Sequence, residues 1–133
     1  MQIIEQIKSA VKAIFLQSFQ AELETVDVVW TKKGQEGDFT VHVFPMLRYV
    51  KMNPQSLSEQ IGKELLLHIN SLESFDAIKG FLNLKLKPEF WLSQLHQIMH
   101  DESFGHAMSD TQQPAVMVEY SSPNTNKPLH LGH

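Results

Sequence analysis

Phe81-Leu82-Asn83-Leu84-Lys85-Leu86-Lys87 alternates strictly, with a leucine at every second position. Successive side chains of a β-strand point to opposite faces, so the leucines face one way, and Phe81 and Asn83 face the other. Pro88 follows directly and suits the first position of a helix. The stretch therefore predicts a half-buried strand and then a helix, whose apolar residues are Phe90, Trp91, Leu95, Ile98 and Met99.

Upstream of this strand, Asn53 and Pro54 form a helix start, with Asn as the cap and Pro at the first helical position. Apolar residues then recur four apart and predict a helix to about Asn70; they are Leu57, Ile61, Leu65 and Ile69. We expect Ser71 to Ser74 to break that helix. Another amphipathic helix is predicted at the N-terminus from Ile3, Ile4, Ile7, Ala10, Val11, Ile14 and Phe15.

Two further strands are predicted between these helices. Val26 to Lys32 is rich in β-branched and aromatic residues, and the turn from Lys33 to Asp38 contains two glycines. Phe39 to Phe44 alternates, which favours a second strand, although a helix starting at Asp38 is the alternative. After Pro45, Met46 to Lys51 can form a short helix.

The order of these elements predicts an α+β domain with a small antiparallel sheet packed by helices. Polar and turn-forming residues fill Asp101 to Pro114, so we place a boundary there, with one domain over 1–109 and a second segment over 110–133. In that segment Ala115 to Tyr120 is a short apolar run. A lone strand cannot pair its backbone, so we expect this strand to belong to a larger sheet.

Composition narrows the function classes. The 133 residues are 42% hydrophobic and carry a net charge of −4. This charge disfavours a partner that would be held mainly by an overall positive charge of the chain. No apolar run is long enough to span a membrane, and the N-terminus does not resemble a signal peptide. The absence of cysteine excludes disulfides and thiolate metal sites and favours a reducing compartment.

The C-terminal segment, residues 110–133, which we call the tail, contains the largest group of candidate ligand-binding residues. If a helix begins near His130, then His130 and His133 share a face of its first turn, where free N–H groups bind phosphate. Gly132 lets a nucleotide approach the backbone. Alternatively, these histidines form a solvated end; as a zinc site they lack a third ligand, so we expect no metal site.

The residues before these histidines indicate a family. Glu119-Tyr120-Ser121-Ser122-Pro123-Asn124-Thr125-Asn126-Lys127-Pro128-Leu129-His130-Leu131-Gly132-His133 resembles the first signature of class I aminoacyl-tRNA synthetases, and within them that of arginyl-tRNA synthetases. The resemblance implies that the tail is the truncated first strand and turn of a Rossmann-type catalytic domain. It also implies that Lys127, His130, Gly132 and His133 contact ATP, and that Glu119, Ser122 and Asn124 face arginine.

The front domain resembles the additional N-terminal domain of that family, above all in Gly80-Phe81-Leu82-Asn83. The resemblance implies that it contacts the D-loop of tRNA, with Phe81 and Asn83 as contact residues. Some relatives use another polar residue just before the Gly-Phe pair, where this chain has Ala77, Ile78 and Lys79. The competing interpretation of Phe81 is an aromatic residue packed under a helix.

The expected intact protein is a cytoplasmic, monomeric arginine–tRNA ligase that uses ATP, with Mg²⁺, L-arginine and tRNA(Arg), and holds no tightly bound cofactor. The chain itself lacks most of the ATP pocket, so we expect it to be inactive. Two alternatives stay open: a non-catalytic RNA-binding module, and a different class I nucleotidyl transferase, which the run from Glu119 to Asn124 disfavours.

Overall fold

A computed structural model describes residues 2–106, 117–118 and 126–128. The chain divides into two compact units, residues 1–102 and 103–133. The first unit contains all the helices and strands that the structure describes. They are α1 (Gln2–Phe19), β1 (Val28–Trp30), β2 (Phe39–His42), the 3-10 helix η1 (Phe44–Arg48), α2 (Pro54–His68), β3 (Leu72–Ile78), β4 (Phe81–Leu86) and α3 (Pro88–His100).

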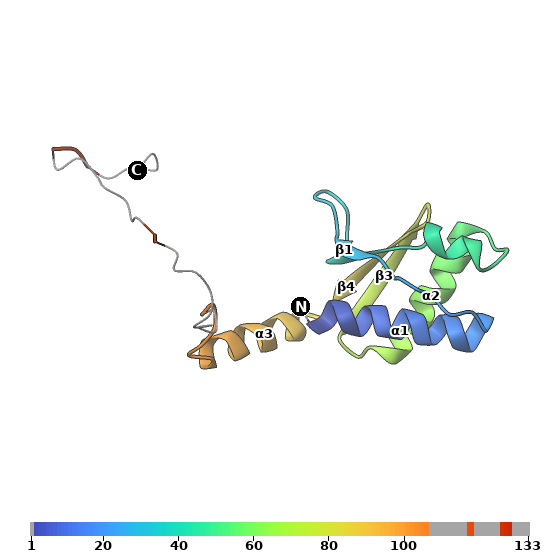
Figure 1. Ribbon diagram of the computed structural model, residues 1–133, viewed down its shortest axis with the longest axis horizontal. Coiled ribbons are helices and arrows are strands. Elements are labelled where there is room, and N and C mark those ends of the chain that lie inside the picture. Colours follow the sequence, from blue (N-terminus) through green and yellow to red (C-terminus); the bar gives the residue numbers. More distant parts are fainter. Residues whose placement is uncertain (1, 107–116, 119–125, 129–133) are drawn as a thin grey trace. The chain divides into compact units, whose positions relative to one another are not determined.

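The four strands form one antiparallel sheet in the order β1-β2-β4-β3 (Figure 1). β4, the alternating stretch, is a central strand: β3 pairs with it from Phe81 to Leu86, and β2 pairs with it from Phe81 to Leu84. The predicted α+β class is therefore confirmed. The helix considered as an alternative at Asp38 is wrong, because β2 begins at Phe39 and pairs on both edges.

β3 was not predicted from the sequence. Residues 71–74 were expected only to end a helix, but the strand already starts at Leu72. A shift of register between Leu72 and Ser74 places an extra residue in the strand, so the period-two pattern is broken. Glu73, Ser74 and Asp76 further dilute the apolar signal, since they lie on exposed positions.

Both long helices pack on the same face of the sheet. α1 contacts α2 and β1, and α2 contacts β3 and β4, and Figure 1 shows α1 (blue) and α2 (green) lying close together. The buried core between these layers includes Ile7, Val11, Phe15, Leu57, Ile61, Leu65, Phe39, Val41, Leu82, Leu84 and Leu86. Full burial of each such side chain contributes roughly 1.5–3 kcal/mol. The three leucines of β4 thus face the helices, as the alternation predicts.

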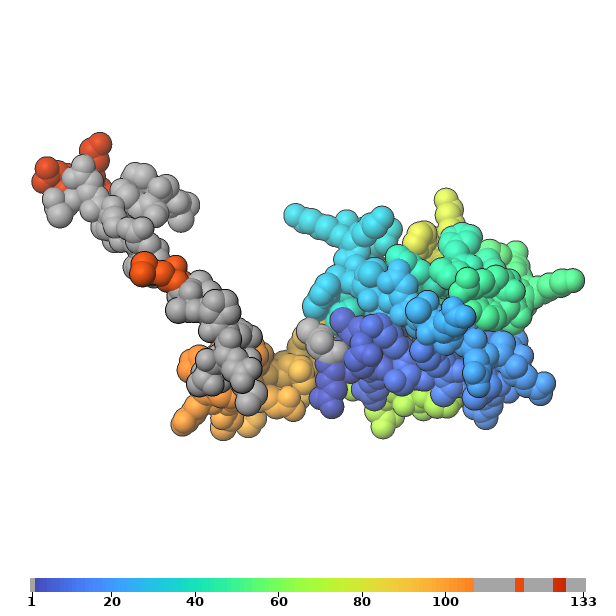
Figure 2. Space-filling view, in the orientation of Figure 1, coloured from blue at the N-terminus to red at the C-terminus, as the bar shows by residue number. Residues whose placement is uncertain are grey.

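Residues 31–38 form a hairpin that projects from the edge of the sheet (light blue in Figures 1 and 2). Asp38 fixes its base to β4: its backbone N–H donates to the Leu84 carbonyl at 2.7 Å, and its carboxylate accepts from the Leu86 N–H at 2.7 Å. The Asp38 carbonyl also accepts from the Thr31 N–H at 3.0 Å. Three hydrogen bonds from one residue therefore hold the hairpin in place over the sheet.

α2 begins as predicted, because the Asn53 side chain accepts from the Gln55 N–H at 2.8 Å and Pro54 takes the first helical position. The predicted third helix is also present as α3, but none of its residues is fully buried. It is attached to the core mainly through Phe90 and Trp91. The structure describes no helix that is both long and apolar enough to cross a membrane.

The predicted first strand of a Rossmann-type domain is not shown. Most of Ala115 to Tyr120 lies outside the described residues, and Met117 and Val118, which are described, are exposed and belong to no strand. The fold that the structure establishes is therefore the α+β unit alone.

Candidate nucleic-acid interface on the open sheet face

Among the described elements, α1 and α2 both lie on one face of the sheet, and the second face is opposite them. Because α1 and α2 both cover the leucine side, alternate residues of the strands point away from the core. Cross-strand pairing brings His42 of β2, Phe81 of β4 and Ile78 of β3 into one row on this face. Thr40, Asn83 and Asp76 form the next row. We call the surface made by these six residues the open face.

Phe81 is the aromatic residue of the open face that lies between His42 and Ile78. It is 38% exposed, so the alternative in which it packs under a helix does not describe this structure. Its ring meets His42 edge-on at 5.4 Å and Phe44 edge-on at 6.2 Å between centroids. These two rings support Phe81 from the side and leave part of it accessible for stacking against a planar ligand.

Asn83 lies on the same face but is only 2% exposed. Its Oδ1 accepts from the Thr40 hydroxyl at 2.7 Å, and the Thr31 hydroxyl lies 3.0 Å from that of Thr40. The hairpin covers it, since a Cβ built on Gly37 would lie 3.2 Å from the Asn83 Cβ. Asn83 therefore joins β2 to β4 beneath the hairpin, and its contact with RNA stays a prediction.

Asp27 contacts both the side chain and the backbone of His42. The Asp27 carboxylate lies 2.5 Å from His42 Nδ1, and the Asp27 carbonyl accepts from the His42 backbone N–H at 3.1 Å. The imidazole is about one-third exposed and lines a hollow beside Phe81. That hollow is also lined by Thr40 and by Lys32 and Gln35 of the hairpin.

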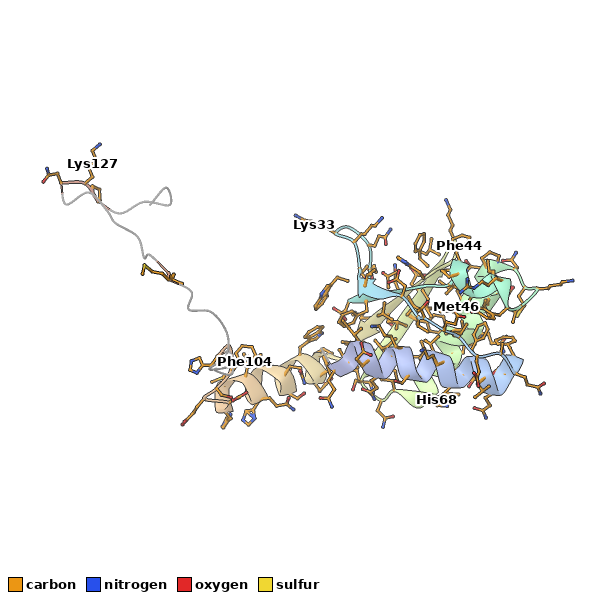
Figure 3. All side chains as sticks on the ribbon, in the orientation of Figure 1. Lys33, Phe44, Met46, His68, Phe104 and Lys127 are labelled. Carbon is orange, nitrogen blue, oxygen red and sulfur yellow. The ribbon has the colours of Figure 1, made fainter. Side chains whose placement is uncertain are left out.

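The lysines of β4 and of the hairpin differ in whether they form an ion pair. Within the described residues, Lys85 pairs with Glu73 at 3.3 Å, whereas Lys32 and Lys33 of the hairpin make no ion pair. Figure 3 shows Lys33 at the tip of the hairpin, pointing outward. The open face thus offers an accessible ring and a histidine, with Lys32 of the hairpin at the same hollow, which are groups that bind unpaired nucleotides.

No metal centre accompanies these groups: in the part of the chain that the structure describes, no three histidine or acidic side chains gather as metal ligands. Among the residues expected to bind ATP, Lys127 is described and exposed. The others, His130, Gly132 and His133, lie outside the described residues, as do the expected arginine contacts Glu119, Ser122 and Asn124. Their roles stay predictions.

Comparison with known families identifies the unit that carries the open face. Residues 1–86 match the family model described as "Arginyl tRNA synthetase N terminal domain". The chain belongs to the arginyl-tRNA synthetase family. Family membership predicted from the tail is therefore confirmed by a match to the front unit, which is an independent part of the sequence.

Similarity to longer relatives extends beyond the front unit into the C-terminal segment of this chain. The chain is 40% identical over 131 residues to an arginine–tRNA ligase of Bacteroides fragilis, a match that covers 98% of this chain but 22% of that protein. It is 45% identical over 103 residues to one of Porphyromonas gingivalis, which covers 77% and 17%. The chain thus spans about a fifth of the length of these relatives.

A solved structure supports the same fold. The arginyl-tRNA synthetase of Thermus thermophilus superposes with a TM-score of 0.58 at 21% identity, over 68% of this chain and 15% of that one. At this identity the likeness concerns the fold alone.

Sequence reasoning did not single out His42, since histidines are dispersed along the chain. The alternation of Phe39 to Phe44 did predict that the side chains of His42 and Val41 point to different faces of the sheet. What the sequence did not contain was the strand order, which makes His42 the direct neighbour of Phe81.

Proposed function

We propose that the chain is the N-terminal part of an enzyme that joins L-arginine to tRNA(Arg) with ATP, and that its open face contacts the tRNA D-loop. Family membership and relatives named arginine–tRNA ligase support the first part. The observation that carries the second is the accessible Phe81 ring on the sheet face opposite α1 and α2. Unpaired loop bases stack on such rings, whereas bases within a duplex cannot.

In the tail, the proposed roles follow the signature. Lys127, His130, Gly132 and His133 contact the ATP phosphates, and Glu119, Ser122 and Asn124 face the arginine substrate. A carboxylate such as Glu119 suits a cationic substrate by charge. We further propose a cytoplasmic, monomeric enzyme.

The alternative is a module that binds RNA without any enzyme attached. The two proposals agree on the open face and differ on the tail. The 40% identity to an arginine–tRNA ligase extends over 98% of the chain, which favours the enzyme. In either case we expect no arginine-dependent exchange of pyrophosphate into ATP by the 133-residue chain, measured with radiolabelled pyrophosphate.

The RNA contact is tested by titrating the 133-residue chain into labelled tRNA(Arg) transcript at low salt and following fluorescence anisotropy. We expect a Kd on the order of 10–100 µM, since the net charge is negative. Phe81→Ala should weaken binding by roughly tenfold or more, because stacking of one base contributes about 1–3 kcal/mol. The wild-type chain should bind a minihelix made of the acceptor and T arms, which lacks the D-loop, no more tightly than Phe81→Ala binds intact tRNA(Arg).

Leu67→Ala is the matched control, since Leu67 is 78% exposed on α2 and away from the open face. It should leave tRNA affinity unchanged. Equal affinity of Phe81→Ala and wild type, with unchanged circular dichroism, would refute the contact, and so would full affinity for the minihelix.

A further inference from the structure

We infer that His42 is a second RNA-contacting residue, which hydrogen-bonds through Nε2 to the edge of the base stacked on Phe81, and that Asp27 positions it. This inference rests on the proposed RNA contact of the open face. It adds a polar contact to a site that otherwise offers mainly an aromatic surface.

The first reason is the place of His42 beside Phe81. β4 has two neighbours, so Phe81 is flanked by His42 of β2 on one side and by Ile78 of β3 on the other. Ile78 is 44% exposed but has no polar side-chain atom. Of the two residues that flank the ring in this row, His42 alone can hydrogen-bond to a base that stacks on Phe81.

The second reason is the orientation of the imidazole. Asp27 Oδ2 lies 2.5 Å from Nδ1, so that nitrogen faces the carboxylate and Nε2 is the ring nitrogen left for a ligand. Edge-on packing against Phe81 holds the ring plane from the other side. A side chain fixed in this way loses little rotamer freedom when it binds, which favours contact with a ligand.

The third reason is the surrounding hollow. The sheet lines it with His42, Phe81 and Thr40 and with Val29 and Trp30 of β1, and the hairpin lines it with Lys32 and Gln35. A base stacked on Phe81 at the mouth of this hollow would have an aromatic ring beneath it, the His42 nitrogen at its edge and the Lys32 cation nearby. Aromatic rings together with a hydrogen-bonding nitrogen and a cation are the groups that contact unpaired nucleotides of RNA.

The experiment is a double-mutant cycle on tRNA(Arg) binding by the 133-residue chain. His42→Phe keeps the ring beside Phe81 but removes both nitrogens, and it should weaken binding by roughly three- to tenfold, the effect of one lost hydrogen bond. Asp27→Ala should weaken binding by about two- to fivefold in the wild-type background. It should have no further effect in the His42→Phe background, because Asp27 acts through His42.

His68→Phe is the matched control. The Nδ1 of His68 also faces an oxygen of the chain, here the Glu64 carbonyl at 2.8 Å, but His68 lies at the end of α2, far from the hairpin tip in Figure 3. If His42→Phe does not fold, His42→Asn replaces it, since Asn keeps a donor for Asp27 and has nothing at the Nε2 position.

The outcomes separate the two proposals. If Phe81→Ala loses affinity while His42→Phe binds like His68→Phe, the role of His42 is refuted and the RNA contact stands. If Phe81→Ala and His42→Phe both bind like wild type, the RNA contact itself fails. If Asp27→Ala weakens binding equally in both backgrounds, Asp27 does not act through His42 and its positioning role is refuted.

Discussion

Two residues set the geometry of the open face from the turn before β4. Lys79 and Gly80 join β3 to β4 with φ angles of +47° and +81°, which is the pattern of a type I′ turn. Such a turn matches the twist of an antiparallel pair and fixes its register. It thereby places Ile78 opposite Phe81. A Cβ at Gly80 would also lie 2.4 Å from the Phe44 ring.

Gly80→Ala should therefore destabilise the fold by about 1–3 kcal/mol, because an L residue is strained at this φ and the Phe44 ring must move. Displacing Phe44 also removes a support of Phe81. Gly34→Ala is the control, since Gly34 has a similar φ of +91° but nothing within 4 Å of its Cβ. Urea unfolding of both variants checks this, and equal losses would mean that the contact with Phe44 contributes nothing.

At the scale of elements, α3 is the most weakly attached helix. Its apolar residues Leu92, Leu95 and Met99 are each more than half exposed. Together with Phe90, Trp91 attaches α3 to the core, and its ring stacks near Trp30 and Phe39, at 6.3 and 6.5 Å between ring centroids. A helix of 13 residues is marginal by itself in water, so α3 depends on this contact.

Trp91→Ala should melt α3 while the sheet, α1 and α2 stay folded. The expected result is fast amide hydrogen exchange over residues 88–100, with protection retained in β4, since local opening follows local packing. Leu92→Ala is the control, as Leu92 is 65% exposed and should change little. Loss of protection in β4 as well would show that α3 is part of the cooperative core.

For the whole molecule, charge decides how RNA binding responds to salt. The chain has 11 basic and 15 acidic residues, so nonspecific attraction to phosphate is small and the proposed binding depends on stacking and local contacts.

The logarithm of tRNA affinity should fall only gently with the logarithm of salt concentration, with a slope of about −1.4 to −2, the value for two or three contacts with phosphates of a single-stranded loop. Anisotropy titrations across a series of salt concentrations measure this slope. A much steeper slope would mean that a larger basic surface dominates binding and that the open face is not the main contact.

Much of the fold followed from the sequence by itself. Alternation of Leu82, Leu84 and Leu86 predicts both the strand and its buried face, and Asn53-Pro54 predicts the start of α2, since these signals are local. The tail signature predicts the family, as it is a contiguous run of specific residues. β3 did not follow, because its extra residue near Glu73 breaks the pattern on which strand prediction relies.

Tertiary structure alone decided the candidate site. The alternation of β4 places Phe81 and Asn83 on one face, but it does not tell that Phe81 is accessible while Asn83 is buried beneath the hairpin. Nor does it tell that His42, 39 positions earlier, is the neighbour of Phe81, held by Asp27. The physical reason is that strand order and the path of a loop depend on long-range pairing and packing, which no local pattern in the sequence encodes.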